Sequence, residues 1–244
     1  MSYPYTTFAL LYDKLLGDRF FARARHNFER LRQRFGLHLH SAADVACGTG
    51  TFVKYLAGLG LRRVYGVDRS AEMLALAIAK NHGNNACFLL QDLKNLSLPQ
   101  PVDLITCNFD SLNYLLTPGH LLHALRMFHN NLKPDGCLVF DMITLHQPWR
   151  GPGPWIEQAR WNGFIFQRRM EIAPLAGLQK SLVRISRNGH TSQEIHMQRV
   201  YPIRKVVDLI KRATLLPVGV HDFYSLGPPT NTTRRVVYVA RNWV

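Results

Sequence analysis

Short apolar segments alternate with segments of helical periodicity across residues 41–142, and this alternation restricts the possible folds more than any other feature of the chain. The expected strands are SAADVA (41–46), RRVYGVD (62–68), ACFLLQD (86–92), VDLITCNFD (102–110) and CLVFDMI (137–143). Strands that alternate with helices are joined by right-handed crossovers, which makes their sheet mostly parallel. The nearly continuous apolar composition of the strands fits a sheet that is covered on both faces. We therefore expect a doubly wound α/β fold.

The segment before this region, residues 1–40, has the apolar spacing of two amphipathic helices. The first stripe consists of Phe8, Leu11, Leu15 and Leu16. The second helix is expected to start at Asp18 as its N-cap and to end at Gly36, because glycine readily adopts the conformation that terminates helices.

Residues 143–202 have a different pattern, in which polar and apolar side chains alternate. The dipeptide Asn188-Gly189 separates two such segments and is a strong signal for a two-residue hairpin. We expect an antiparallel insertion of three or four strands here. Residues 203–244 then predict one helix and two strands, which bring the main sheet to seven strands.

The turn DVACGTG (44–50) directly follows the first expected strand and precedes a helix. Gly48 and Gly50 lack a Cβ, so the backbone there can approach a ligand closely. The next helix N-terminus adds free N–H groups and positive partial charge. The spacing is A-x-G-x-G, which is not the G-x-G-x-x-G spacing of dinucleotide-binding folds, and this disfavours an NAD-dependent dehydrogenase.

Two further acids stand at the ends of strands. Asp68 ends the second strand, where its carboxylate can accept both hydroxyls of a ribose. Asp92 ends the third strand, where a carboxylate can accept an exocyclic amine. Because open α/β sheets bind ligands at the carboxyl ends of their parallel strands, Asp44, Asp68 and Asp92 are expected to share one cleft.

The order DVACGTG, VYGVDRSAEML, QDLKNL, FDSLNYL and LKPDGCLVFDM resembles that of class I S-adenosylmethionine-dependent methyltransferases. The resemblance is continuous over 41–142 and implies that S-adenosyl-L-methionine is the cofactor. One departure is Ala46, where many members carry glycine; alanine fits if that residue keeps a negative φ.

The resemblance implies a role for each matching position. Asp44 would approach the methionine amino group, Asp68 would bind the ribose, and Asp92 would meet the adenine. Tyr12 would close over the cofactor. The full set of implied cofactor-binding residues is Tyr12, Asp44, Ala46, Cys47, Gly48, Gly50, Asp68, Arg69, Met73, Asp92, Leu93, Asn108 and Phe109.

The acceptor side is less defined. Tyr114 and His146 are candidate catalytic groups: Tyr114 follows the fourth strand, close to the expected methyl position, and His146 follows the fifth strand and opens the insertion. His196 and His221 are further histidines that could act as a base. The expected antiparallel insertion of this chain resembles the substrate lid of glycine N-methyltransferase and of the sugar N,N-dimethyltransferases, which belong to the same family. Side chains that could line a pocket for an aromatic or anionic acceptor are Trp149, Trp155, Trp161, Arg150, Arg168 and Arg199.

The sequence thus predicts four regions: N-terminal helices that cap the cofactor site (1–40), the cofactor-binding core (41–142), the lid (143–202), and a closing helix with two strands (203–244). A small-molecule N- or O-methyltransferase is the leading hypothesis. The alternatives are an RNA or protein methyltransferase and a non-catalytic binding protein with a methyltransferase-like fold.

Composition bears on these alternatives. Lys plus Arg is 30 against 16 for Asp plus Glu, a formal net charge of +14, which keeps a nucleic-acid partner open. The basic residues are scattered rather than gathered in a run, which disfavours a nucleic-acid partner. The sequence after the fourth strand is NFDS rather than the N-P-P-Y that marks base or amide methylation in the family, and the resemblance therefore disfavours DNA adenine and glutamine as targets. We expect a cytoplasmic protein because no signal peptide or membrane span is evident. The four cysteines have no zinc spacing, so we expect no metal and buried, reduced thiols.

Overall fold

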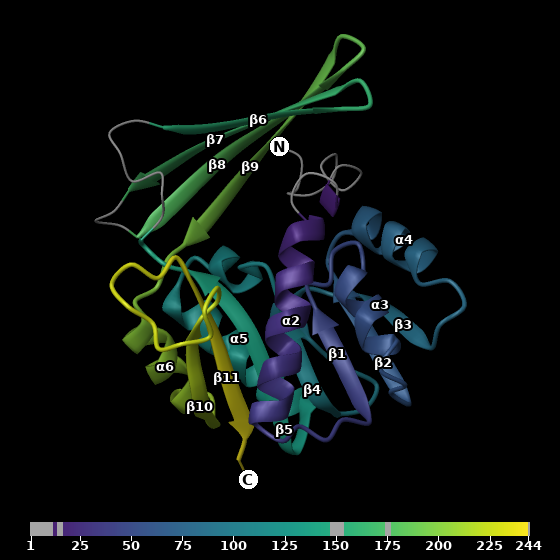
Figure 1. The fold of residues 1–244 in the computed structure, drawn as a ribbon, viewed down its shortest axis with the longest axis vertical. Helices are drawn as coiled ribbons and strands as arrows, with labels where there is room; N and C mark the ends of the chain where they lie inside the picture. The colour runs from purple at the N-terminus through teal and green to yellow at the C-terminus, as the bar shows by residue number, and fades with distance from the viewer. Residues whose placement is uncertain (1–11, 14–16, 147–153, 174–176, 244) are drawn as a thin grey trace.

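The protein folds into a seven-stranded sheet with helices on both faces and a separate four-stranded sheet above one edge (Figure 1). The structure is a computed structural model that describes residues 12–13, 17–146, 154–173 and 177–243. The expected helix stripe at Phe8, Leu11, Leu15 and Leu16 lies outside the described residues.

The large sheet has the order β10-β11-β5-β4-β1-β2-β3. Its strands are β1 (Ser41–Val45), β2 (Arg63–Asp68), β3 (Ala86–Leu90), β4 (Val102–Cys107), β5 (Leu132–Ile143), β10 (Leu215–Asp222) and β11 (Arg235–Asn242). The first five pair in parallel, whereas β11 is antiparallel to both β5 and β10. The chain order reverses beside β1, where β4 and β2 flank it on opposite sides, and such a reversal opens a crevice for ligands.

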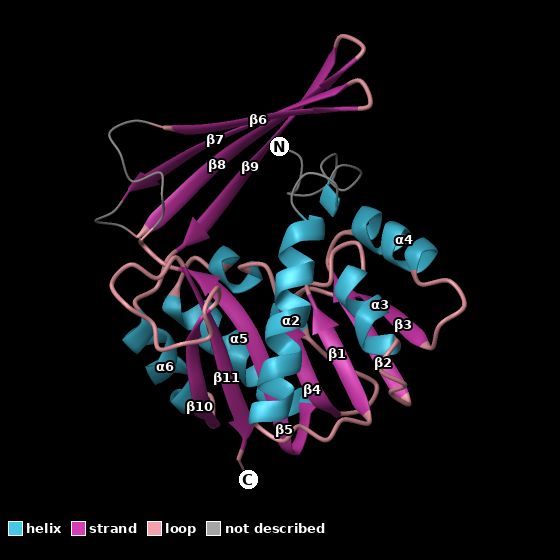
Figure 2. Cartoon of the chain, in the orientation of Figure 1, coloured by secondary structure: helices cyan, strands magenta, loops and turns pink. Residues whose placement is uncertain are grey.

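Helices cover both faces of this sheet, as Figure 2 shows. They are α2 (Asp18–Arg34), α3 (Thr51–Ala57), α4 (Ala71–Lys80), α5 (Pro118–Asn131) and α6 (Ile203–Arg212), with short 3₁₀ turns η2 (Leu93–Asn95) and η3 (Ser111–Tyr114). One apolar cluster joins the sheet to α2, α3 and α4, and the other joins it to α5 and α6. Side chains of β4 alternate between them: Leu104 belongs to the first cluster and Ile105 to the second. No helix within the described residues is long and apolar enough to cross a membrane.

The helix ends follow the sequence signals with one exception. The Ser70 hydroxyl caps α4 by accepting the N–H of Met73 at 3.1 Å. Gly36, at φ 57°, ends α2 with a backbone hydrogen bond to Gln33. Asp18 is not an N-cap: it is the first residue of α2, and Gly17 takes the N-cap position.

The insertion is a four-stranded antiparallel sheet, which we call the lid sheet. It consists of β6 (Trp155–Trp161), β7 (Phe164–Ala173), β8 (Leu178–Arg187) and β9 (His190–Arg199) in that order. Asn188 and Gly189 connect β8 to β9 with φ of 49° and 80°, so the expected hairpin is confirmed. In β8, Val183 and Ile185 are buried whereas Arg184 is exposed, so one face of the lid sheet is covered.

The cysteines are all free thiols. Cys47, Cys107 and Cys137 are buried as expected, but Cys87 is exposed. Cys87 lies in β3, which is the edge strand of the sheet and therefore has one uncovered side.

Candidate functional site

A cavity of about 270 Å³ lies where the parallel strands end. All the predicted cofactor-binding residues except Gly50 line it: Tyr12, Asp44, Ala46, Cys47, Gly48, Asp68, Arg69, Met73, Asp92, Leu93, Asn108 and Phe109. Its wall also includes residues that the sequence did not single out, among them Phe21, Gln91, Lys94, Ser111, Leu115, Leu116 and His120. The strand ends thus converge on one shared cavity.

The turn after β1 is built from left-handed backbone. Ala46 has φ 57° and Gly48 has φ 54°. The expectation that Ala46 keeps a negative φ is therefore wrong. A left-handed conformation brings the Cβ of an L-residue too close to the following carbonyl oxygen, at a cost of about 1–2 kcal/mol, so this position favours glycine. The N–H of Cys47, which donates to the Val67 carbonyl at 2.9 Å, helps to hold the turn against β2.

Gly50 does not line the cavity. It sits at the N-cap of α3 with φ 73°, and a Cβ there would lie 2.8 Å from both Ala77 Cβ and Asn81 Nδ2. Its small size therefore allows α3 to pack closely against α4 instead of admitting a ligand.

Asp68 links the turn to the second strand. One carboxylate oxygen accepts the N–H of Gly48 at 2.8 Å, and the other accepts the N–H of Ser70 at 2.9 Å. Burial raises the pKa of Asp68, and these two hydrogen bonds oppose the shift. The carboxylate is thereby fixed in orientation at the cavity wall.

Asp44 is almost completely buried at the end of β1. The Thr106 hydroxyl donates to its Oδ1 at 2.6 Å, and the Asn108 amide donates to the same oxygen at 3.4 Å. Burial raises the pKa of Asp44 to about 7, although both hydrogen bonds lower it. The group is thus poised to ionise when a cation enters the cavity.

Asp92 follows β3 and is more accessible. Its Oδ1 accepts the N–H of Lys94 at 2.9 Å and so caps η2. Its Oδ2 lies 3.9 Å from the Arg69 guanidinium, an ion pair that is too exposed to stabilise the fold much. Both side chains line the cavity and can turn toward a ligand.

Phe109 is held in an unusual conformation. Phe109 and Asp110 have φ of 59° and 51°, and non-glycine residues in this region cost about 1–3 kcal/mol each. The carboxylate of Asp141 compensates: it accepts the N–H of Phe109 at 2.7 Å and that of Asp110 at 3.0 Å. The Phe109 ring then meets the Tyr12 ring edge-on, with centroids 5.4 Å apart.

A buried arginine supports this loop. Arg235 pairs with Asp110 at 2.5 Å and with Asp141, and its guanidinium also lies 5.5 Å from the centroid of the Phe109 ring. Burial opposes the charge of Arg235, but the two carboxylates outweigh it and raise its pKa above the usual value. Sequence reasoning missed this cluster; the one available signal was a carboxylate at Asp141 inside an apolar strand segment.

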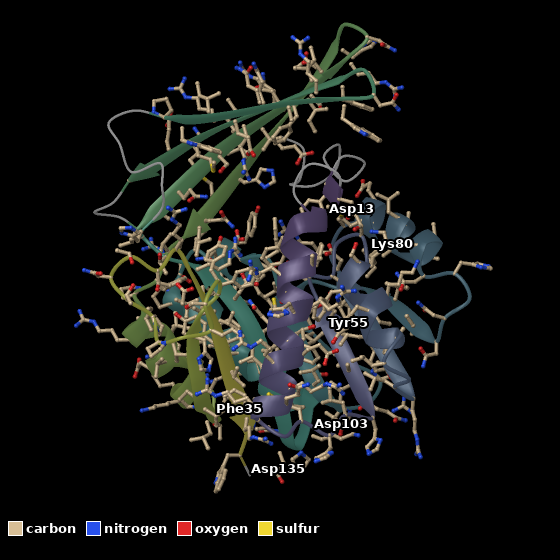
Figure 3. The ribbon with its side chains drawn as sticks, in the orientation of Figure 1. Asp13, Phe35, Tyr55, Lys80, Asp103 and Asp135 are labelled. Atoms are coloured by element: carbon tan, nitrogen blue, oxygen red, sulfur yellow. The ribbon has the colours of Figure 1, made fainter. Side chains whose placement is uncertain are left out.

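Polar contacts hold Tyr12 beside the cavity. The next residue, Asp13, pairs with Lys80 at 2.5 Å and accepts the Thr49 hydroxyl at 2.5 Å (Figure 3). Lys80 also donates to the hydroxyls of Thr49 and Thr51, at 2.8 Å and 2.7 Å. We call Asp13, Thr49, Thr51 and Lys80 the latch, since it joins the segment that carries Tyr12 to α3 and α4.

Of the candidate catalytic residues, some lie at the cavity and others lie away from it. Tyr114 lines the cavity, and its hydroxyl lies 2.7 Å from Nδ1 of His196 in β9. His146 does not line the cavity, and its N–H donates to the Thr144 hydroxyl. His221 lies in β10 next to Phe35, away from the cavity, where burial lowers its pKa.

Four of the expected acceptor-binding side chains of the lid are described by the structure, and these four, Trp155, Trp161, Arg168 and Arg199, do not line the cavity. Arg168 pairs with Glu157 at 2.5 Å, and the Nε of Arg199 donates to the Leu116 carbonyl at 2.5 Å. Trp155 and Trp161 belong to β6, and Trp161 is exposed. Trp149 and Arg150 lie outside the described residues. Among the side chains that the structure describes, no cluster of His, Cys, Asp and Glu is placed to hold a metal ion.

Comparison with known proteins gives a consistent result for the core. Residues 42–136 match the family described as methyltransferase domain. A candidate methyltransferase of Geobacillus sp. (strain WCH70) is 33% identical over 146 residues, which are 59% of each chain. The dTDP-3-amino-3,6-dideoxy-alpha-D-glucopyranose N,N-dimethyltransferase of Streptomyces fradiae is 29% identical over 160 residues, 66% of this chain and 54% of that one. This chain therefore matches little more than half the length of these relatives.

Solved structures match over nearly the whole chain. An S-adenosylmethionine-dependent methyltransferase from Clostridium acetobutylicum ATCC 824 has a TM-score of 0.84 and 24% identity, and the match covers 98% of this chain and 99% of that one. The CcbJ methyltransferase from Streptomyces caelestis has a TM-score of 0.81 and 21% identity, over 97% and 96%. At these identities the likeness establishes the fold, including the expected seven-stranded, mostly parallel sheet and the antiparallel insertion.

Proposed function

We propose that this chain, whose residues 42–136 form a methyltransferase domain, is an enzyme that transfers the methyl group of S-adenosylmethionine to a nitrogen or oxygen of a small molecule. The observation that carries the proposal is the convergence of Asp44, Asp68 and Asp92 on one cavity beside the Gly48 turn. These three acids come from the ends of three neighbouring strands, and all three line the same space.

The turn at Gly48 fits a ligand that needs close backbone contact. A Cβ placed on Gly48 would lie 3.9 Å from Met73 Sδ and 4.0 Å from Tyr12 Cε1, so it would project between two cavity-lining side chains. The left-handed φ of Gly48 is a conformation that glycine adopts readily, so a residue with a side chain is disfavoured at this point of the cavity wall.

The chemistry of the lining supports one orientation of the cofactor. Asp68 has its carboxylate fixed by two backbone N–H groups and would accept the ribose hydroxyls. Asp92 and Leu93 would contact the adenine. Asp44 would pair with the methionine ammonium, because a buried carboxylate with a raised pKa is stabilised by a cation. Tyr12 and Phe109 would then lie close to the sulfonium.

When bound, the cofactor supplies an activated methyl group for in-line displacement. The chain's contribution is to hold the acceptor on the line of attack and to exclude water. Phe109 has its backbone fixed by Asp141, and Tyr12 is held by the latch, so both rings present fixed apolar walls. Tyr114, Ser111 and His120 supply polar groups for an acceptor in the same cavity.

A small acceptor is favoured over a macromolecule. Arg168 and Arg199 of the lid bond within the protein, to Glu157 and to the Leu116 carbonyl, so these two side chains supply no open basic surface next to the cavity. A related chain is named as an amino-sugar N,N-dimethyltransferase, which supports an amine or hydroxyl of sugar-like size. In this proposal residues 1–40 cap the cofactor site, 41–142 bind the cofactor, 143–202 form the acceptor lid and 203–244 complete the sheet.

Calorimetric titration with S-adenosylhomocysteine tests the cofactor assignment, and we expect micromolar affinity. Incubation with methyl-labelled cofactor and a small-molecule metabolite extract, or with total RNA, tests the acceptor. Label in a small molecule supports the proposal, whereas label in RNA favours the alternative. The absence of binding at millimolar ligand by a folded protein would reject the cofactor assignment.

A further inference from the structure

Three polar side chains form a chain from the cavity into the lid sheet. Tyr114 belongs to η3 of the core and lines the cavity. Its hydroxyl lies 2.7 Å from Nδ1 of His196, and His196 Nε2 lies 3.4 Å from Oε2 of Glu194. His196 and Glu194 both belong to β9, so the chain of contacts crosses from the core to the lid.

The two lid residues are deeply buried. His196 is 5% exposed and Glu194 is 2% exposed, on the same face of the lid sheet as the buried side chains of Val183 and Met170. A carboxylate and an imidazole in such surroundings cost free energy unless each is paired. The same face also buries the polar side chains of Ser181, Gln179 and Gln198, so His196 and Glu194 belong to a polar interior of the lid sheet rather than to a packed apolar core.

The contacts define the roles of the two ring nitrogens. Glu194, next to Nε2, favours the tautomer that carries its proton on Nε2. In that tautomer Nδ1 is the acceptor of the 2.7 Å contact and the Tyr114 hydroxyl is its donor. This is the order of a nucleophile or acceptor, a base, and a carboxylate that orients the base.

We propose that Tyr114, His196 and Glu194 form a relay that removes the proton from the methyl acceptor. The acceptor N–H or O–H bond breaks and its proton goes to Tyr114 Oη, while the proton of Tyr114 moves to His196 Nδ1. The electron pair stays on the acceptor atom and forms the new bond to the methyl carbon, and the cofactor leaves as a neutral thioether. The carboxylate of Glu194 stabilises the resulting imidazolium. This inference rests on the proposed methyl-transfer function.

The relay spans the contact between the lid sheet and the core. Arg199 and Gln198 of β9 fix the lid to the core: Arg199 donates to the Leu116 carbonyl at 2.5 Å and Gln198 donates to Asp110 Oδ2 at 2.5 Å. Asn113, next to Tyr114, donates to the Arg199 carbonyl at 2.7 Å. These contacts between the lid sheet and the core hold the His196 ring beside Tyr114 at the cavity.

The first test is the tautomer of His196, measured by ¹⁵N NMR on the full chain with S-adenosylhomocysteine bound. The His196→Asn variant assigns the signal. We expect the His196 ring to carry a proton on Nε2 and none on Nδ1, with a change in the Nδ1 shift in Tyr114→Phe. A ring protonated on Nδ1, or an Nδ1 chemical shift that is the same in wild type and Tyr114→Phe, would overturn the relay. If the wild-type protein binds no S-adenosylhomocysteine, the proposed function fails first, and the two failures are thus distinguishable.

The second test is the rate of methyl incorporation from labelled cofactor into the metabolite extract. Tyr114→Phe and His196→Asn should each lower the rate about a hundredfold, and Glu194→Gln should lower it less, because it acts through His196. Affinity for S-adenosylhomocysteine should change little, and the rates are compared at a temperature at which every variant is folded. His190→Asn, an exposed histidine on the same strand, is the matched control and should leave the rate unchanged. Equal rates in wild type and His196→Asn would refute the proposal.

Discussion

The titration of Asp44 predicts a specific pH dependence of ligand binding. Burial raises the pKa of Asp44 to about 7, and the ammonium group of the cofactor would bind the ionised form. Between about pH 8 and about pH 6 the ionised fraction falls roughly tenfold, so the affinity for S-adenosylhomocysteine should also fall roughly tenfold. The free energy of unfolding without ligand should have the opposite pH dependence to the affinity. A raised pKa means that the folded state holds the proton more tightly than the unfolded state, so stability declines as pH rises from about 4 through about 7.

The assay is calorimetric titration at several pH values in two buffers with different heats of ionisation. Below about pH 7 the wild-type protein should release protons on binding. The pKa of Asp68 is also raised by burial, so it could contribute to the slope. The Asp44→Asn variant separates the two: it should bind more weakly at high pH and lose most of the pH dependence. A wild-type affinity that is flat from about pH 6 to about pH 8, or a slope that persists in Asp44→Asn, would refute this reasoning.

Three further predictions concern residues around the cavity. Asp13→Asn and Lys80→Met should each weaken binding of S-adenosylhomocysteine about threefold by calorimetry, because a half-buried ion pair holds the segment of Tyr12; the double variant should be no weaker than either single one, and additive losses would count against the latch. Ala46→Gly should raise the free energy of unfolding by about 1 kcal/mol in urea, since it relieves a left-handed φ; a loss would mean that the methyl packs usefully. Arg235→Met should cost about 3–5 kcal/mol, because two buried carboxylates lose their partner; a cost below about 1 kcal/mol would contradict the role given to this cluster.

Local patterns were enough to predict the core of the fold. The alternation of strands and helices indicated the parallel sheet, and Asn188-Gly189 indicated the lid hairpin. The three strand-end acids were placed in one cleft because parallel strands end at one edge. These inferences use spacing over a few residues, which the sequence displays directly.

Contacts between distant segments were not predictable in this way. Tyr114 and His196 are separated by 82 positions, and Asp141 and Arg235 by 94, so no local pattern reveals either pair. The backbone of Ala46 was also misjudged, because its left-handed φ is imposed by the hydrogen bonds of the turn and overrides the preference of alanine. Gly50 was assigned to the cavity by its place in the motif, whereas helix packing explains it.

The most direct test of the central claim is a crystal structure of the chain with S-adenosylhomocysteine. We expect the nucleoside in the cavity at the ends of β1, β2 and β3, with its ribose on Asp68 and its ammonium on Asp44. Ligand bound elsewhere, or in this cavity with neither acid in contact, would contradict the account.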